Sequence, residues 1–143
     1  MERKHVRRTA ESAVLFLVLA TLLVVSATPV AAMPGRHQLG ARLDGTSHYS
    51  YARGHAYYEG WGGHREFGVD MWRMGRLRGQ TLVVFAGRRK VGSFRVRSDR
   101  GCHMHRDTGA GQSVPTLSAG DLITVRTHGG ALVASGTLRR VMM

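Results

Sequence analysis

The stretch TLVVFAGRRKVGSFRVR, residues 81–97, decides the fold class. Residues 81–85 are mostly apolar and rich in β-branched and aromatic side chains, which favours a strand buried on both faces. Residues 86–89 turn the chain around a glycine, and residues 90–97 return with apolar side chains separated by polar ones. Gly92 interrupts this alternation and indicates a bulge. The stretch therefore predicts a β-hairpin.

The rest of the chain after residue 32 has the same character, because no segment shows a helical period. Gly-rich turns separate further expected strands at residues 41–44, 54–59, 66–74, 102–106, 121–127 and 131–138. Seven to eight short antiparallel strands at this spacing are typical of a sandwich or a small barrel. We favour an all-β sandwich, Ig-like or Greek-key, over residues 41–143. Its expected core contains Phe67, Val69, Met71, Val84, Phe94, Val96, Ile123, Val125 and Leu132.

The first 32 residues have the three parts of a secretory signal peptide. Four basic residues come first, an apolar run follows from residue 13 to residue 25, and Ala31 and Ala32 provide a small-residue exit. We expect cleavage after Ala32, a flexible leader over residues 33–40, and a secreted or cell-envelope location. An uncleaved membrane anchor is the alternative, and the pair Arg7-Arg8 leaves twin-arginine export open beside the general secretory route.

The chain is strongly basic, with 21 Lys and Arg against nine Asp and Glu among its 143 residues, for a net charge of +12. A positive field of this size favours anionic partners, and the planar guanidinium of arginine pairs well with phosphate and carboxylate. We expect a module for anionic envelope polymers or lipid headgroups, with no physiological nucleic acid. Scattered arginines that only keep the protein dispersed are the alternative. The candidate anion-binding residues are Arg65, Arg73, Arg88, Arg89, Arg95 and Arg97.

A run of metal-ligating side chains, CHMH at residues 102–105, is the second candidate site. In a strand His103 and His105 share one face, and an imidazole pair suits copper or zinc. The pair needs a third ligand from elsewhere, such as His55, His64 or His128. The alternative is a solvated strand with no metal. Since Cys102 is the only cysteine, an internal disulfide and Cys-rich metal clusters are excluded.

Enzyme motifs are missing from the sequence. There is no Gly-x-Ser-x-Gly elbow, no phosphate-binding loop and no zinc-protease helix motif. Glu66 and Asp70 would share a strand face, but four strand residues separate them by about 13 Å, which exceeds the span of a glycosidase pair. Aromatic residues near arginines could instead stack on sugars, or simply belong to the core. We therefore expect a non-catalytic domain without a resident cofactor.

Three motifs carry a resemblance: KVGS at residues 90–93, VPTLSAGDLITV at residues 114–125 and GALVASGTL at residues 130–138. Together they resemble small exported bacterial β-domains of unassigned function, in which a kvG strand, a VPxxxAGD connection and a closing GxLxxSGxL strand recur. More weakly, the chain is similar to secreted chordin-repeat domains, which are β-rich and carry a His-x-His, here with Cys102 in place of the preceding alanine. The resemblance implies a β-rich exported domain and supplies no catalytic residue.

Overall fold

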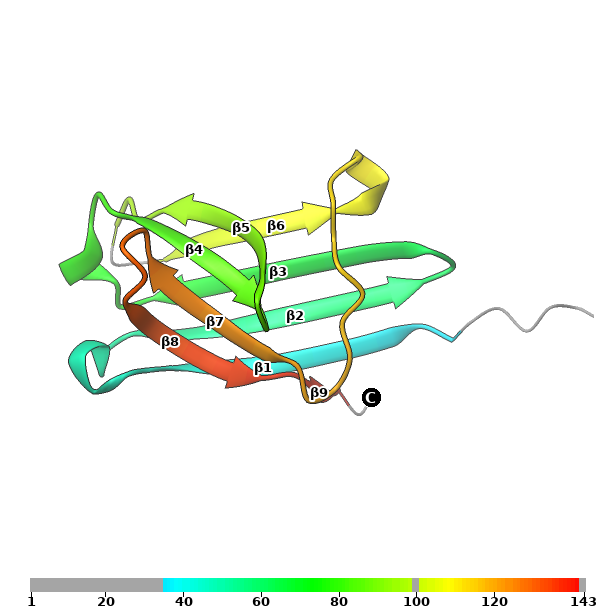
Figure 1. Cartoon of the computed structure of the whole chain (residues 1–143), viewed down its shortest axis with the longest axis horizontal. Coiled ribbons are helices and arrows are strands. Elements are labelled where there is room, and N and C mark those ends of the chain that lie inside the picture. The colour runs from blue at the N-terminus through cyan, green and yellow to red at the C-terminus, as the bar shows by residue number, and fades with distance from the viewer. Residues whose placement is uncertain (1–34, 99–100, 142–143) are drawn as a thin grey trace, which may run out of the picture. The chain divides into compact units, whose positions relative to one another are not determined.

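The computed structural model describes residues 35–98 and 101–141, which form a domain of antiparallel strands (Figure 1). The predicted signal segment and the start of the predicted leader lie outside the described residues. The strands are β1 (His37–Gly45), β2 (Arg53–Trp61), β3 (His64–Trp72), β4 (Thr81–Ala86), β5 (Arg89–Arg95), β6 (Cys102–Asp107), β7 (Leu122–Thr127), β8 (Leu132–Thr137) and β9 (Arg139–Arg140). Three single-turn 3-10 helices connect them: η1 (Ser47–Tyr49), η2 (Gly75–Leu77) and η3 (Thr108–Ala110).

All nine strands belong to one sheet in the order β5-β4-β7-β8-β1-β2-β3-β6, with β9 paired to β1. The sheet curls until β5 and β6 come together, so it is nearly closed and barrel-like. At this seam Gly92 of β5 lies against β6, where an added Cβ would be 2.4 Å from the Met104 sulfur. The predicted all-β antiparallel class is confirmed. In place of two separate sheets, the structure has one continuous sheet whose halves face each other.

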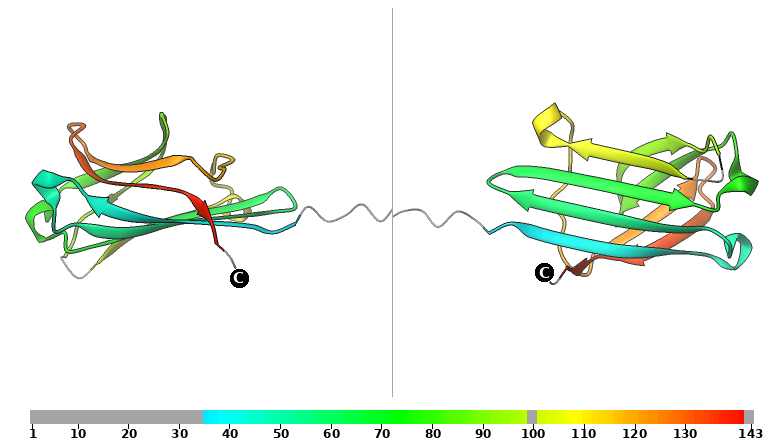
Figure 2. Two further views of the ribbon diagram at one scale, coloured as in Figure 1. Left: turned by 90° about the horizontal axis from the view of Figure 1, so that it is seen from below. Right: turned by 180° about the vertical axis from the view of Figure 1, so that it is seen from behind.

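The two halves form layers that are seen one above the other in Figure 2. One layer contains β1, β2, β3 and β6, and the other contains β4, β5, β7 and β8. Fully buried side chains from both layers fill the space between them. The largest are Phe67, Leu43, Met71, Met74, Leu77, Leu82, Ile123 and Leu138.

The predicted strands are found close to their expected positions, with one exception at the N-terminal edge. The sequence places a short edge strand at residues 41–44 after a flexible leader, whereas β1 spans nine residues and lies between β2 and β8. Residues 37–40 of the predicted leader are therefore part of the sheet. Leu39 and Ala41 are buried and pack with the core, which explains why the strand begins at His37 and not at residue 41.

Eight of the nine predicted core residues are buried, and Leu132 is not. The physical reason is a register shift between Val125 and Arg126, which places Leu132 opposite Arg126. Because directly paired residues share a face of the sheet, Leu132 points outward with Arg126. Val133 takes the inward position and is fully buried.

Candidate functional site

Charge is distributed unequally between the outer faces of the two layers. Six carboxylate side chains lie in the part of the chain that the structure describes. Five of them, Asp44, Glu59, Glu66, Asp70 and Asp107, are on strands β1, β2, β3 and β6 at outward positions, and we call this outer face the carboxylate face. The sixth, Asp121, precedes β7 and accepts a hydrogen bond from the Ser118 backbone N–H.

The outer face of the other layer carries cations and none of these five carboxylates. Register explains which side chains point outward: Thr81 pairs with Arg95, and Phe85 pairs with Lys90. Val83 pairs with Arg126 of β7. Both residues are on the outer side of the sheet, because the neighbouring Val84 points into the core. We call this surface, completed by the hairpin turn, the basic face. Its cations are Arg88, Lys90, Arg95, Arg97 and Arg126, and the exposed Arg89 lies beside them at the end of the hairpin, where it pairs with the inward-facing Ala86.

Of the six arginines predicted to bind anions, Arg88, Arg95 and Arg97 belong to the basic face, Arg89 lies at its hairpin end, and two lie elsewhere. Arg65 is at an inward-facing position of β3, where its Nη1 donates to Thr116 Oγ1 at 2.8 Å and its Nε is buried without a partner. Arg73 follows β3 on the other layer and has a positive φ of 60°. The six arginines therefore do not form one surface. Sequence spacing alone did not reveal that Lys90 and Arg126 would replace these two.

The predicted histidine pair shares the carboxylate face, as strand alternation requires. His103 is directly opposite Asp70, and His105 is directly opposite Gly68. The Tyr57 ring covers Gly68 and lies stacked 6.3 Å from the His105 ring. His105 Nε2 is 3.8 Å from Glu66 Oε2. The two histidines thus lie beside different carboxylates, and no described histidine joins both of them in one group of potential ligands.

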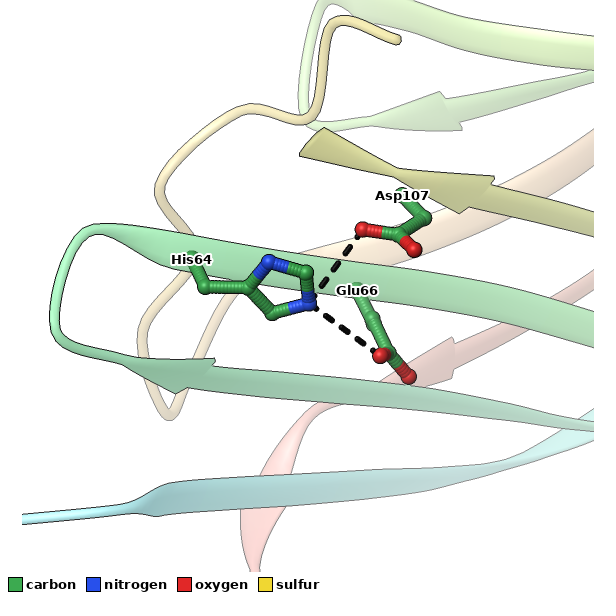
Figure 3. A group of neighbouring side chains, drawn as sticks. All are labelled: His64, Glu66 and Asp107. Atoms are coloured by element: carbon green, nitrogen blue, oxygen red, sulfur yellow. Dashed lines mark hydrogen bonds and ion pairs between the residues drawn. The ribbon is translucent and has the colours of Figure 1, made fainter. Parts of the chain in front are cut away.

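A tighter group of ligating side chains forms beside them from His64, Glu66 and Asp107 (Figure 3). His64 and Glu66 are two residues apart on β3, and Glu66 is directly opposite Asp107 of β6. His64 Nε2 is 3.2 Å from Glu66 Oε1 and 3.2 Å from Asp107 Oδ1. The sequence indicates His64 only as a possible third ligand for the His103–His105 pair, and the predicted strand over residues 102–106 ends one residue before Asp107. The pairing of β3 with β6 brings the side chains of His64, Glu66 and Asp107 together. No residue pattern within either strand predicts that the two strands pair.

Two ionisable groups near these faces have pKa values shifted by their surroundings. Burial, followed by the negative charges of Asp70 and Glu66, raises the pKa of Tyr57. Burial, followed by Asp70, raises the pKa of the Cys102 thiol to about 11. Cys102 points inward and its thiol donates to the Met71 carbonyl at 3.8 Å. A thiol with this pKa is protonated at neutral pH, so Cys102 is a poor nucleophile and a poor thiolate ligand.

In comparisons with known proteins, no protein-family model, curated protein or solved structure matches the chain. Among residues 35–98 and 101–141, no helix has the length and apolar character needed to cross a membrane.

Proposed function

We propose that this chain is an exported, non-catalytic domain that binds anionic polymers of the cell envelope through its basic face. The observation that carries the proposal is the segregation of charge. Five of the six described carboxylates are on the opposite layer, so the basic-face cations have few internal partners. Among the described ion pairs, none joins a basic-face cation to a carboxylate.

The shape of the basic face favours a linear ligand. Lys90 and Arg95 point outward near the two ends of β5, and five residues at about 3.3 Å each place them about 16 Å apart. Arg126 lies on β7, on the far side of β4 from β5. Arg95 Nε donates to the Gly79 carbonyl and Arg126 Nη1 to the Gly130 carbonyl, and these bonds restrict both side chains. A polymer with regularly spaced phosphates or carboxylates would contact several of these cations at once.

Paired charge reversal tests the proposal. Arg88 lies in the exposed β4–β5 turn and Arg89 begins β5 beside it, and R88E/R89E should strongly weaken binding to teichoic-acid-like and heparin-like polymers. R139E/R140E on β9 is the matched control, because it makes the same change of charge at two exposed adjacent arginines outside the basic face. Equal losses in both variants would indicate diffuse attraction by net charge and would refute a defined face.

The salt dependence supplies a second readout. Binding driven by counterion release weakens linearly in log–log form, with a slope of roughly 0.9 per phosphate contact on a duplex-like polyanion. R88E/R89E should therefore reduce the slope by about 2. Anionic vesicles in a parallel titration distinguish lipid headgroups from polymers. Absence of binding to either at low salt would end the proposal.

The export part of the proposal rests on the N-terminal sequence alone. A basic start, an apolar run and a small-residue exit are typical of a cleaved secretory leader. We propose that the released domain begins at Met33, four residues before β1. If the protein is instead found in the membrane with an intact Met1, the N-terminal segment is not cleaved and the domain is anchored.

A further inference from the structure

We propose that His64, Glu66 and Asp107 bind a divalent transition-metal ion, with zinc as the best match, on the carboxylate face. This inference does not depend on polymer binding, because the three residues belong to the layer opposite the basic face. It also differs from the site expected from sequence, since His103 is not a ligand in it.

The spacing of the three donor atoms matches a small ion. Zinc binds imidazole nitrogen and carboxylate oxygen at about 2.0–2.2 Å, so donors around a tetrahedral zinc lie roughly 3.3–3.5 Å from one another. His64 Nε2 is 3.2 Å from an oxygen of each carboxylate, and all three donor atoms lie within 4.8 Å of one another. To admit the ion, the His64 ring would have to shift by a few tenths of an ångström, and the two carboxylates would have to move closer to each other. Figure 3 shows the imidazole edge between the two carboxylates.

Electrostatics favour a cation at this position. Glu59, Glu66 and Asp107 occupy directly opposite positions on three adjacent strands, where like charges destabilise the sheet. Glu59 is engaged by Arg36 and by Gln38 Nε2, which donates at 2.8 Å. Among the described Lys and Arg side chains, none forms an ion pair with Glu66 or Asp107, whose ion-pair partners are histidines. A bound dication would supply the positive charge that no described Lys or Arg provides to these two carboxylates.

The surrounding structure holds the donors in place before any ion binds. Asp107 Oδ1 accepts from the Gly109 backbone N–H at 2.6 Å. Gly109 also lets η3 pass close to the imidazole, because an added Cβ would be 2.8 Å from His64 Cε1. On its other side the His64 ring packs against Trp61, with the ring centroids 4.2 Å apart. The three ligand side chains are each only about a quarter exposed, at 25–29%. Such positioning reduces the entropy that binding must overcome.

His105 is the available fourth ligand. It is two residues from Asp107 on the same face of β6, and its Nε2 is already 3.8 Å from Glu66 Oε2. Rotation of its side chain would bring a second imidazole to the ion, and water would otherwise fill this coordination position. Two imidazoles and two carboxylates form a donor set of nitrogen and oxygen, which suits zinc better than Cu(I).

Titration of the untagged protein with Zn²⁺, followed by calorimetry and native mass spectrometry, tests the site. We expect one zinc per chain and a rise in melting temperature with zinc. H64A, E66Q and D107N should each weaken zinc affinity at least tenfold, and H105A should weaken it less. H103A and D70N are the matched controls, because they change the same residue types on the same face outside the site, and they should leave the affinity unchanged.

The isosteric variants separate ligation from a structural role. E66Q and D107N remove a charge from the carboxylate row, so the metal-free variants should melt at or above the wild-type temperature while losing the zinc-induced rise. Retention of that rise in both variants would overturn the proposal. So would an affinity no tighter than about 100 µM, which at roughly −5.5 kcal/mol is a loose surface contact. An effect of H103A as large as that of H64A would return the site to the His-x-His pair.

Discussion

Replacement of Gly136 by alanine should open the junction between β1 and β8. A Cβ at this position would be 2.0 Å from the Arg42 carbonyl oxygen and 2.9 Å from its carbonyl carbon. Both are backbone atoms, so no side-chain rotation relieves the contact. Ordinary non-bonded contacts are about 3.5 Å. The two strands would therefore have to separate by more than 1 Å, next to the Asp44–Ser135 pair that joins them.

The expected cost follows from three contributions. Overpacking a close contact costs about 1–3 kcal/mol, and weakening one backbone hydrogen bond between β1 and β8 costs about 0.5–1.5 kcal/mol. The alanine also reduces the conformational entropy of the unfolded chain, which stabilises the folded state by about 0.4–1 kcal/mol. The net destabilisation is about 2–3 kcal/mol, equivalent to a fall in melting temperature of roughly 10 °C for a domain of this size.

Urea unfolding monitored by circular dichroism measures this difference. Gly129→Ala is the matched control, because its added Cβ would meet nothing closer than Thr127 Oγ1 at 3.9 Å. That variant should be within about 0.5 kcal/mol of wild type or slightly more stable. If Gly136→Ala has the same unfolding midpoint as Gly129→Ala, the close approach of β8 to β1 is wrong, and with it this closure of the sheet.

Three further outcomes are expected. Phe94→Ala should lower the free energy of unfolding by about 3–5 kcal/mol, since Phe94 is 9% exposed; a loss below about 1 kcal/mol would contradict its inward position. Alkylation of Cys102 should stay slow at pH 8 and rise towards pH 11, because the thiol pKa is raised to about 11, chiefly by burial. The unfolded thiol ionises first, so stability should fall between pH 9 and 11; Asp70→Asn should accelerate alkylation, and an unperturbed rate profile would argue against a buried thiol. Secreted protein should give an N-terminal sequence starting at or near Met33, whereas a Met1 start on membrane-extracted protein would mean anchoring.

Local patterns predicted most strands because period-two alternation is a property of neighbouring residues. Phe67, Val69 and Met71 alternate along β3 and are all buried. The bulge that turns Leu132 outward depends on how β8 pairs with β7, and the sequence of β8 contains no sign of it. The closure of the sheet is also non-local, because it needs β6 beside β3 and β8 beside β1.

The candidate sites show the same limit. Strand alternation put His103 and His105 on one face, and the hairpin turn made Arg88 and Arg89 exposed neighbours. The junction of Asp107 with His64 spans two strands that are far apart in sequence, so spacing could not find it. The predicted strand begins at residue 66 and leaves Arg65 outside it, whereas β3 begins at His64 and puts Arg65 on the inward face with Phe67, where it donates to Thr116.

The position of β1 determines when this domain can fold. β1 holds together the two halves of the sheet, yet Asp44 and its β8 partner Ser135 are 91 positions apart. During synthesis β1 can pair early with β2, but its other edge waits for β8, and loop closure over this length precedes any gain from that contact. Such a topology folds slowly and late. The sheet therefore cannot close before the C-terminal strands have emerged, and the proposed export in an unfolded state is compatible with this delay.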